Sequence, residues 1–336
     1  MRTIIFCSVI TLSLLVSSCS PPPEYAEING LTQGTTYHIV VEKTPGLDIM
    51  GLRQQVEKLL TDVDNSLSIY NDSSVISLIN AGASDSTDIL FQEVFRKSMI
   101  VSELSGGLFD ITIGPLVKAW GFGPDALKRF DETMLDSLLA LVGMDKVRLE
   151  GDRIIKADPD MFIDANAIAQ GYTVDLLVDL MKQEGIYECL VEVGGEVRTA
   201  GDKRGSGWHV GIDTPADGNF TPGAELQAKV RLDNRALATS GNYRRFFVED
   251  GVKYSHTIDP RTGFPVRHTL LSATVIASDC AMADAWATAC MVAGTGPAIA
   301  FIERYDFLGG YLIYSDENGE MRSWMSEGLK NLIEER

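Results

Sequence analysis

The chain has 336 residues, of which 45% are apolar, and its formal net charge is −18 at pH 7. This length and apolar content are enough for one large domain or two modest ones with a buried core, which excludes a mainly disordered chain. The acidic balance argues against nucleic-acid binding and against attraction to an anionic membrane surface, because both favour clustered Lys and Arg. An anionic substrate would need local compensation, most simply a bound metal ion together with backbone N–H groups.

The N-terminus has the pattern of a secretory signal. A short basic start is followed by an apolar run over 4–16, and Val16-Ser17-Ser18-Cys19 ends it. The run is shorter than the roughly 20 residues that a spanning helix needs. An ordinary signal peptide cleaved nearby is one interpretation, and the small residues before a single cysteine favour another.

Those small residues resemble the lipobox of bacterial lipoproteins. We therefore expect a signal peptide over 1–18, a lipidated Cys19 that carries palmitate, and a stiff proline-rich tether within 19–26. Such an anchor would place the protein in the bacterial cell envelope, attached to a membrane and facing the periplasm. Ser20, in place of Asp, slightly favours the outer membrane over the inner one.

Of the five cysteines, Cys7 lies in the signal segment and Cys19 is the expected lipid site, so three remain. Cys189, Cys280 and Cys290 each lie in an apolar setting. This favours buried small hydrophobic residues over a disulfide framework or a cysteine-rich metal site.

Hydrophobic periodicity predicts the elements in chain order. The first half of the chain predicts a strand over 26–41, helices over 52–67, 74–79 and 87–105, a glycine-bounded loop over 106–123, a short helix over 133–142, a hairpin over 147–157, and a strand ending at Asp164 that leads into a helix to about 183. The second half predicts strands over 190–201 joined at a glycine pair, strands over 208–212 and 226–232, strands from 238 to 256, a strand over 271–277, a helix over 279–292, and a last helix and strand over 297–304 and 310–314. Because strands and helices are mixed without strict alternation, the sequence predicts an α+β fold of antiparallel-rich sheets with packed helices.

Two neighbouring stretches carry the strongest chemical signal. His256 ends a strand-like segment that breaks at Asp259-Pro260, since proline fixes its own φ and keeps its predecessor out of the helical region. Asp284 and Thr288 lie four residues apart, so on a helix they share one face and can offer oxygen to a hard cation such as Mg²⁺. A proton-handling group beside a cation site suggests phosphate chemistry.

Structural roles compete with these assignments. Thr288 could bond its own helix backbone while Asp284 faces water. The residues around Asp284 are apolar almost all round the helix, however, and an unpaired buried carboxylate is costly. His256 alone would be an ordinary core or surface histidine, and the neighbouring cation pair favours a base. We give His38, His209 and His268 ordinary structural roles.

Other residues admit two interpretations each. Tyr70 is either core or an aromatic plate for a flat heterocycle. The 106–123 segment either buries Phe109 and Trp120 or lets its backbone approach a ligand. Asp164 either reaches a crevice at a strand end or caps the following helix.

Five segments in order resemble the FAD:protein FMN transferase family, the ApbE-like lipoproteins. They are Gln33-Gly34-Thr35, Gly107-Leu108-Phe109-Asp110 with Gly114-Pro115-Leu116, residues 164–171, Val193-Gly194-Gly195, and residues 255–263 with 283–288. The resemblance implies a single FAD-binding domain over 27–336 with an ApbE-like, T-fold-related architecture. It also implies that Mg²⁺ assists the splitting of FAD, that FMN is joined to a Ser or Thr hydroxyl of an acceptor protein, and that AMP leaves.

Carried over by position, the resemblance also assigns residues. The metal would be held by Asp284, Thr288 and the main-chain oxygen of Ala167, and His256 falls where the family has the histidine that activates the acceptor hydroxyl. The residues that would meet FAD are Gln33, Tyr70, Leu108, Phe109, Asp110, Asp164, Gln170 and Ile258. Gln33, Asn166 and Gln170 depart from the residues common in the family, which puts the grip on FAD in doubt without touching the metal chemistry.

Three activities remain open from the sequence. The leading one is flavin transfer to a membrane or periplasmic redox subunit that carries a Ser/Thr flavinylation motif. The second is a Mg²⁺-dependent FAD pyrophosphatase, in which water replaces the acceptor and FMN and AMP are released. The third is a non-catalytic flavin-binding lipoprotein.

Overall fold

The computed structural model describes residues 23–122, 132–216, 223–242, 246–249, 252–255 and 257–335, the backbone alone for 246–249, 252–255 and 335. The expected signal peptide, the lipid site at Cys19 and the candidate base His256 lie outside the described residues. Within the described ranges, no helix has the length and apolar character needed to cross a membrane.

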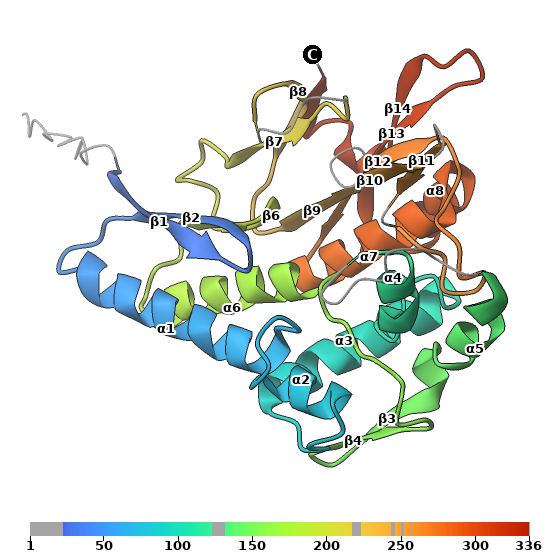
Figure 1. The fold of residues 1–336 in the computed structure, drawn as a ribbon. Coiled ribbons are helices and arrows are strands. Elements are labelled where there is room, and N and C mark those ends of the chain that lie inside the picture. The colour runs from blue at the N-terminus through green and yellow to red at the C-terminus, as the bar shows by residue number, and fades with distance from the viewer. Residues whose placement is uncertain are drawn as a thin grey trace, which may run out of the picture.

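An eight-stranded antiparallel sheet forms the centre of the molecule (Figure 1). Its strands run in the order β1-β2-β5-β6-β9-β12-β13-β14, so it joins early and late parts of the chain. The strands are β1 (Tyr25–Thr32), β2 (Thr35–Glu42), β5 (Cys189–Val193), β6 (Glu196–Ala200), β9 (Ala236–Gly241), β12 (Leu270–Ala277), β13 (Gly309–Ser315) and β14 (Met321–Met325). The predicted α+β fold with antiparallel sheets is confirmed.

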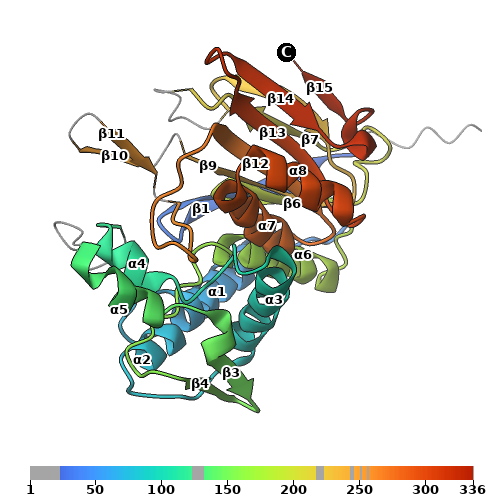
Figure 2. The same cartoon turned by 90° about the vertical axis from the view of Figure 1, so that its right-hand side faces the viewer.

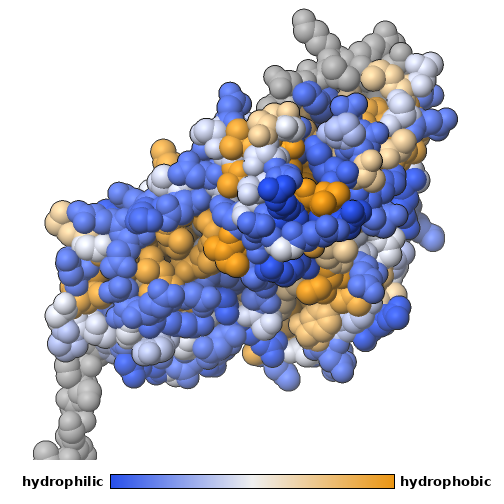
Figure 3. Space-filling model, turned by 90° about the horizontal axis from the view of Figure 1, so that it is seen from below, coloured by the Kyte–Doolittle hydropathy of each residue, from blue (hydrophilic) through white to orange (hydrophobic). Residues whose placement is uncertain are grey.

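Two layers of helices cover one face of this sheet (Figure 2). Helices α6 (Ala169–Gln183) and α7 (Cys280–Ala293) lie against the strands, with α1 (Ile49–Leu67) and α3 (Ile89–Ser105) behind them. The remaining helices are α2 (Val75–Asn80), α4 (Gly114–Ala119), α5 (Leu135–Ala140) and α8 (Thr295–Arg304), with 3₁₀ turns at Glu132–Met134, Met144–Lys146 and Glu327–Leu329. Seen from the side of α1, α2 and the hairpin over 147–156, the surface is largely hydrophilic with separate apolar patches (Figure 3).

A small three-stranded sheet packs on the other face of the large one. Its order is β15-β8-β7, and its buried side chains, among them Ile212 and Val230, meet Leu237 and Tyr311 of the large sheet. The remaining strands are β7 (His209–Asp213), β8 (Leu226–Arg231), β15 (Ile333–Glu335) and the hairpins β3 (Val147–Glu150)–β4 (Arg153–Lys156) and β10 (Phe246–Glu249)–β11 (Val252–Ser255). Among the described residues, β7 is one of the two edge strands of the small sheet.

Local sequence signals placed several element ends correctly. Ser74 accepts a hydrogen bond from the Ser77 N–H at the start of α2, and Gly106 ends α3 in the left-handed conformation. Cys189, Cys280 and Cys290 are buried free thiols, as expected.

The single strand predicted over 26–41 is wrong, because the chain forms a hairpin there. β1 and β2 pair through a two-residue turn at Gln33-Gly34, with φ values of 49° and 72°. A type I′ hairpin turn needs positive φ at both central residues, which Asn-Gly or Asp-Gly would have signalled. Glutamine at the first position hid the turn.

The strand predicted to end at Asp164 is also wrong, since 161–168 forms no strand. The Asn80 side chain substitutes for a neighbouring strand: its Oδ1 accepts from the Ile163 N–H, and its Nδ2 donates to the Ile163 carbonyl, both at 2.8 Å. The Asp164 N–H donates to the Ile111 carbonyl at 2.7 Å. Helix α4, inside the predicted loop over 106–123, and strands β14 and β15 were not predicted.

Candidate active site

A large cavity opens at the ends of several elements and is lined by all the residues that the sequence assigned to FAD or metal within the described chain. Its volume of about 1950 Å³ exceeds the roughly 300–1,000 Å³ of ordinary small-molecule sites. The lining includes the β1–β2 hairpin tip, the segments 108–110 and 164–170, the glycine pair before β6, the end of β9, residues 257–260, and Asp284 and Thr288 of α7. The space is sufficient for a dinucleotide together with part of a second substrate.

Asp284 reaches the cavity because α6 and α7 approach unusually closely. A β-carbon at Gly171 would lie 2.4 Å from the Cys280 carbonyl oxygen and 2.8 Å from the Asp284 Cβ, so only glycine fits there. The Gly171 N–H in turn donates to Asp284 Oδ2 at 3.1 Å. The contact fixes the carboxylate at the junction of the two helices.

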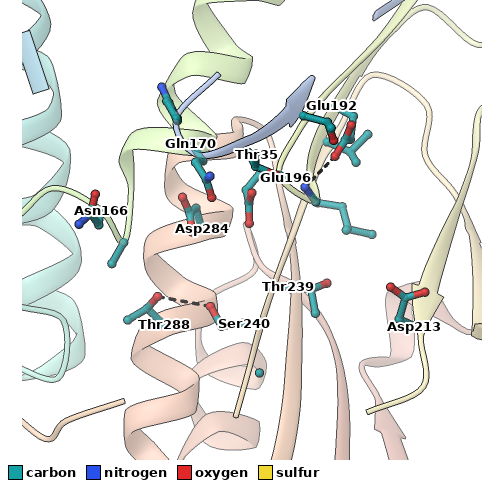
Figure 4. A pocket seen from close by; sticks show the side chains of 18 of the residues that line it. Thr35, Asn166, Gln170, Glu192, Glu196, Asp213, Thr239, Ser240, Asp284 and Thr288 are labelled. Carbon is teal, nitrogen blue, oxygen red and sulfur yellow. Dashed lines mark hydrogen bonds between the residues drawn. The ribbon is translucent and has the colours of Figure 1, made fainter. Parts of the chain in front are cut away.

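A second buried carboxylate, Glu196 at the start of β6, lies beside Asp284 on the cavity wall (Figure 4). Both side chains are 7% exposed. Burial, and then the negative charge of Glu196, raise the pKa of Asp284 well above its usual value, while the Gly171 amide opposes the rise. Two buried carboxylates so placed are stabilised by a shared proton or by a cation.

Hydroxyl groups complete the oxygen-rich wall. Thr288 Oγ1 and Ser240 Oγ lie 3.3 Å apart, and Ala167 lines the cavity near the start of α6. Within the described part of the chain, no three His, Cys, Asp or Glu side chains gather as a metal cluster. A cation here would therefore depend on hydroxyl and main-chain oxygens as well as on carboxylate, a set that suits Mg²⁺.

The comparisons with known proteins agree with this geometry. The family model described as the ApbE family matches residues 33–310. The chain belongs to the ApbE family. The predicted family is thereby confirmed.

Curated and solved members of the ApbE family match most of the chain. A protein of Vibrio cholerae named FAD:protein FMN transferase is 36% identical over 299 residues, which cover 86% of this chain and 88% of that one, and a Haemophilus influenzae protein of the same name is 31% identical over 97% and 96%. The solved flavin transferase ApbE from Vibrio cholerae has a TM-score of 0.83 at 31% identity and covers 93% of this chain and 100% of that one. The apo form of the Pseudomonas stutzeri flavinyl transferase ApbE gives 0.82 at 31%, with 92% and 97% covered.

Two of the residues that the resemblance assigns to FAD, Tyr70 and Gln33, line the cavity with groups that could contact a ligand. Tyr70 is 65% exposed, which rules out a core role and leaves its ring free to stack. Gln33 Nε2 donates to Thr173 Oγ1 at 2.7 Å, whereas its buried Oε1 has no hydrogen-bond partner among the described residues. Gln170 lies against Gly194, where a β-carbon would come within 2.8 Å of its Nε2.

Asp110 and Asp164 line the cavity with side chains that also hold the local backbone. Asp110 accepts from the Thr112 and Met144 N–H groups at 2.7 and 3.1 Å, and burial raises its pKa. Asp164 accepts from the Asn166 N–H at 2.9 Å, and burial raises its pKa too. The alternative of a helix cap at Asp164 is wrong, because α6 begins after Ile168 without a side-chain cap.

The turn predicted at Asp259-Pro260 is present and packed. The Gly263 N–H donates to the Asp259 carbonyl at 2.8 Å. Burial would raise the pKa of the Asp259 carboxyl, but the hydrogen bonds that Arg261 donates to it lower that pKa below its usual value. Trp120 Nε1 donates to the Gly263 carbonyl at 2.7 Å. Phe109 is buried and Trp120 half-buried, so this ApbE segment both packs the core and lines the cavity.

Sequence reasoning missed Glu196 and Ser240. Glu196 directly follows the Gly194-Gly195 pair, and Ser240 lies in the strand before Gly241; both are polar residues next to glycine. The sequence alone does not show that they meet α7, because that contact depends on strand order.

Proposed function

We propose that this ApbE-family chain transfers FMN from FAD to a Ser or Thr hydroxyl of an acceptor protein and releases AMP. The single observation that carries the proposal is the cavity in which the Asp284–Glu196 carboxylate pair lies beside the residues matched to FAD. The family match and the shared name of the relatives support it.

Asp284, Thr288 and the main-chain oxygen of Ala167 would hold Mg²⁺. When bound, the ion would offset the negative charge of the FAD diphosphate and the charge that develops on the phosphate under attack. The raised pKa of Asp284 supports this assignment, because a divalent cation would relieve the repulsion that Glu196 imposes.

The other lining residues bind and orient FAD. Tyr70 would stack on a ring of the dinucleotide, the 108–110 segment would pass its backbone along it, and Gln33 would offer its buried Oε1 as an acceptor. Together with Asp164, Gln170 and Ile258 they would fix the scissile anhydride near α7. Positioning of this kind supplies much of the rate in phosphoryl-type transfer.

His256 is proposed as the base. The acceptor oxygen would form a bond to the FMN phosphorus as its proton passes to the imidazole, and the bond to the AMP phosphate would break with AMP as the leaving group. A neutral imidazole has a pKa near the working pH, which suits it to this role.

The proposal includes the cellular setting. Lipidation of Cys19 would tether the protein to a bacterial envelope membrane on the periplasmic side, within reach of membrane or periplasmic redox subunits. Fractionation tests this: Cys19→Ala should move the protein from the membrane to the soluble fraction, and a variant that stays membrane-bound would contradict the anchor.

The test of activity uses the whole protein with FAD, Mg²⁺ and an acceptor carrying a Ser/Thr flavinylation motif. We expect a fluorescent acceptor band that survives denaturation, with AMP released in equal amount. AMP without a labelled band would instead indicate FAD hydrolysis. Retention of FAD without AMP would indicate a non-catalytic flavin carrier.

A further inference from the structure

The cavity extends beyond the residues matched to FAD and metal into a second arm, here called the β7 arm. Its floor is the outer face of β1, β2 and β5, and its wall is β7. The floor residues are Glu27, His38, Val40, Leu190 and Glu192. Figure 4 shows Asp213 of β7 on the far side of Thr239 from Asp284. None of the residues assigned to FAD lies in this arm, so it is open to the second substrate.

The backbone of β7 has unused hydrogen-bonding groups along this wall. The Trp208 carbonyl accepts from the Leu232 N–H at 2.7 Å, so Trp208, Val210 and Ile212 direct their backbone groups toward β8. Antiparallel pairing alternates, and His209 and Gly211 therefore direct theirs the other way.

The neighbouring strand shows the same alternation. Arg231, paired with His209, donates its N–H away from β7 to the Leu332 carbonyl at 2.8 Å. Among the described residues, no backbone group pairs with the N–H or carbonyl of His209 or Gly211, and both residues are exposed. The edge of the small sheet thus offers two outward-facing residues of a strand.

We propose that the acceptor protein docks as an extended segment that pairs with His209 and Gly211 of β7 inside the β7 arm. This rests on the proposed transfer function and names how its second substrate binds. An unpaired strand edge is a template for another strand, and β-strand addition is a common way to bind a peptide. The arm is continuous with the Asp284 end of the cavity, so a docked segment would bring its hydroxyl to the diphosphate.

The chemistry of the arm fits a polypeptide better than a flavin or an adenine. Its walls carry both signs of charge, with Glu27, Glu192 and Asp213 against Lys203, and its edge offers alternating donors and acceptors at strand spacing. A dinucleotide has no matching repeat. Backbone pairing also places few demands on the side chains of the docked segment.

The edge strand provides a specific test, because Gly211→Pro removes the outward N–H and leaves the β7–β8 ladder intact. Proline is tolerated on an edge strand at a position where the N–H of another residue would point away from the sheet. Gly211→Ala is the matched control: it adds a β-carbon near Leu226, as proline does, but keeps the N–H. We expect Gly211→Pro to raise the KM for the acceptor about ten-fold above that of Gly211→Ala, the effect of one lost hydrogen bond.

FAD affinity and the unfolding temperature, measured for both variants, show whether each remains folded with an intact flavin site. If wild type labels the acceptor and the folded Gly211→Pro variant has the KM of Gly211→Ala, the docking proposal is overturned while the proposed function stands. If wild type labels no acceptor, the proposed function fails first.

Hydrogen exchange gives a second readout that does not depend on turnover. The probe is the same acceptor with its Ser or Thr replaced by Ala, so that it binds without reacting. Peptides covering residues 208–213 should gain protection of about two amides on binding, as two outward N–H groups become paired. Unchanged exchange in β7 with saturating acceptor would overturn the proposal.

Discussion

Two buried carboxylates near the first turns of α7 have opposite surroundings. Asp175 of α6 accepts from the Cys280 and Ala281 N–H groups at 2.8 and 2.9 Å and pairs with Arg198 at 2.7 Å. Asp284, one turn further along α7, accepts from the Gly171 N–H alone among the described residues, and it faces Glu196 instead of an arginine.

The pKa directions express this difference. Burial raises the pKa of Asp175 to about 6, against the lowering effects of Arg198 and the two amides. For Asp284, burial and Glu196 act in the same direction, and only one amide opposes them. Asp175, whose charge is compensated by Arg198 and two amides, holds α6 and α7 together. Asp284, which lacks a positive partner, is suited to bind a cation.

The largest expected effect comes from a substitution at Asp284, the carboxylate without a positive partner. Asp284→Asn keeps the size of the side chain but removes the charge, and we expect transfer to fall about 10³-fold, since metal stabilisation supplies several kcal/mol. Stability without Mg²⁺ should be unchanged or higher, because a poorly compensated buried charge is lost.

The measurements are acceptor labelling and thermal unfolding with and without Mg²⁺. Mg²⁺ should raise the unfolding temperature of the wild type and leave the variant unaffected. A variant that labels the acceptor at the wild-type rate would show that the ion, if present, binds elsewhere.

A smaller loss of activity is expected from the proton-handling group. His256→Ala should reduce transfer by roughly 10²-fold, because the acceptor hydroxyl loses its base, while FAD binding is spared. Fluorescence titration of FAD and the labelling rate separate the two effects. Full activity in this variant would remove the base assignment.

The structural role of Asp175 is tested by its effect on the free energy of unfolding. Asp175→Asn leaves the half-buried Arg198 charge without its partner, which costs about 3 kcal/mol of unfolding free energy, the low end for buried ion pairs. Urea denaturation measures the loss, and labelling per folded molecule should stay close to wild type. A stable variant with abolished transfer would reverse the roles we assign to the two carboxylates.

Part of the local structure near the site followed from the sequence. The spacing of Asp284 and Thr288 predicted one helix face, and both residues do line the same cavity from α7. The break at Asp259-Pro260 predicted a turn, which is present. These features depend on residues near one another in the chain, and periodicity and turn chemistry report them directly.

What the sequence could not supply depends on distant contacts. Glu196 meets Asp284 only because β6 lies beside α6 and because Gly171 lets α7 approach so closely. The Asn80 side chain bonds the backbone of Ile163 as a neighbouring strand would, although the two residues are 83 positions apart. No local sequence pattern predicts such a contact. The Gln33 turn was hidden for a different reason, since a residue that rarely adopts positive φ occupies it.

The smallest expected effect concerns the C-terminal end of α7, which is contacted by a histidine that does not itself line the cavity. His268 Nε2 lies 2.7 Å from the Met291 carbonyl, and burial lowers the pKa of the ring although that carbonyl opposes the shift. The folded state therefore binds this proton less readily than the unfolded state, whose pKa is near 6.5. The neutral ring contributes stability above that pH, and the contribution is lost as the pH falls from about 6.5 toward the lower folded pKa.

Replacing His268 by Gln should therefore flatten the acid side of the stability profile while leaving transfer at neutral pH close to wild type. Urea denaturation at several pH values between 5 and about 7 measures the slope. Gln keeps a donor near the position of Nε2 for the Met291 carbonyl, so a large loss of stability at neutral pH is not expected. If the slope of the variant matches that of the wild type, the ring does not change its protonation on unfolding, and the pH dependence of stability then rests on the buried carboxylates.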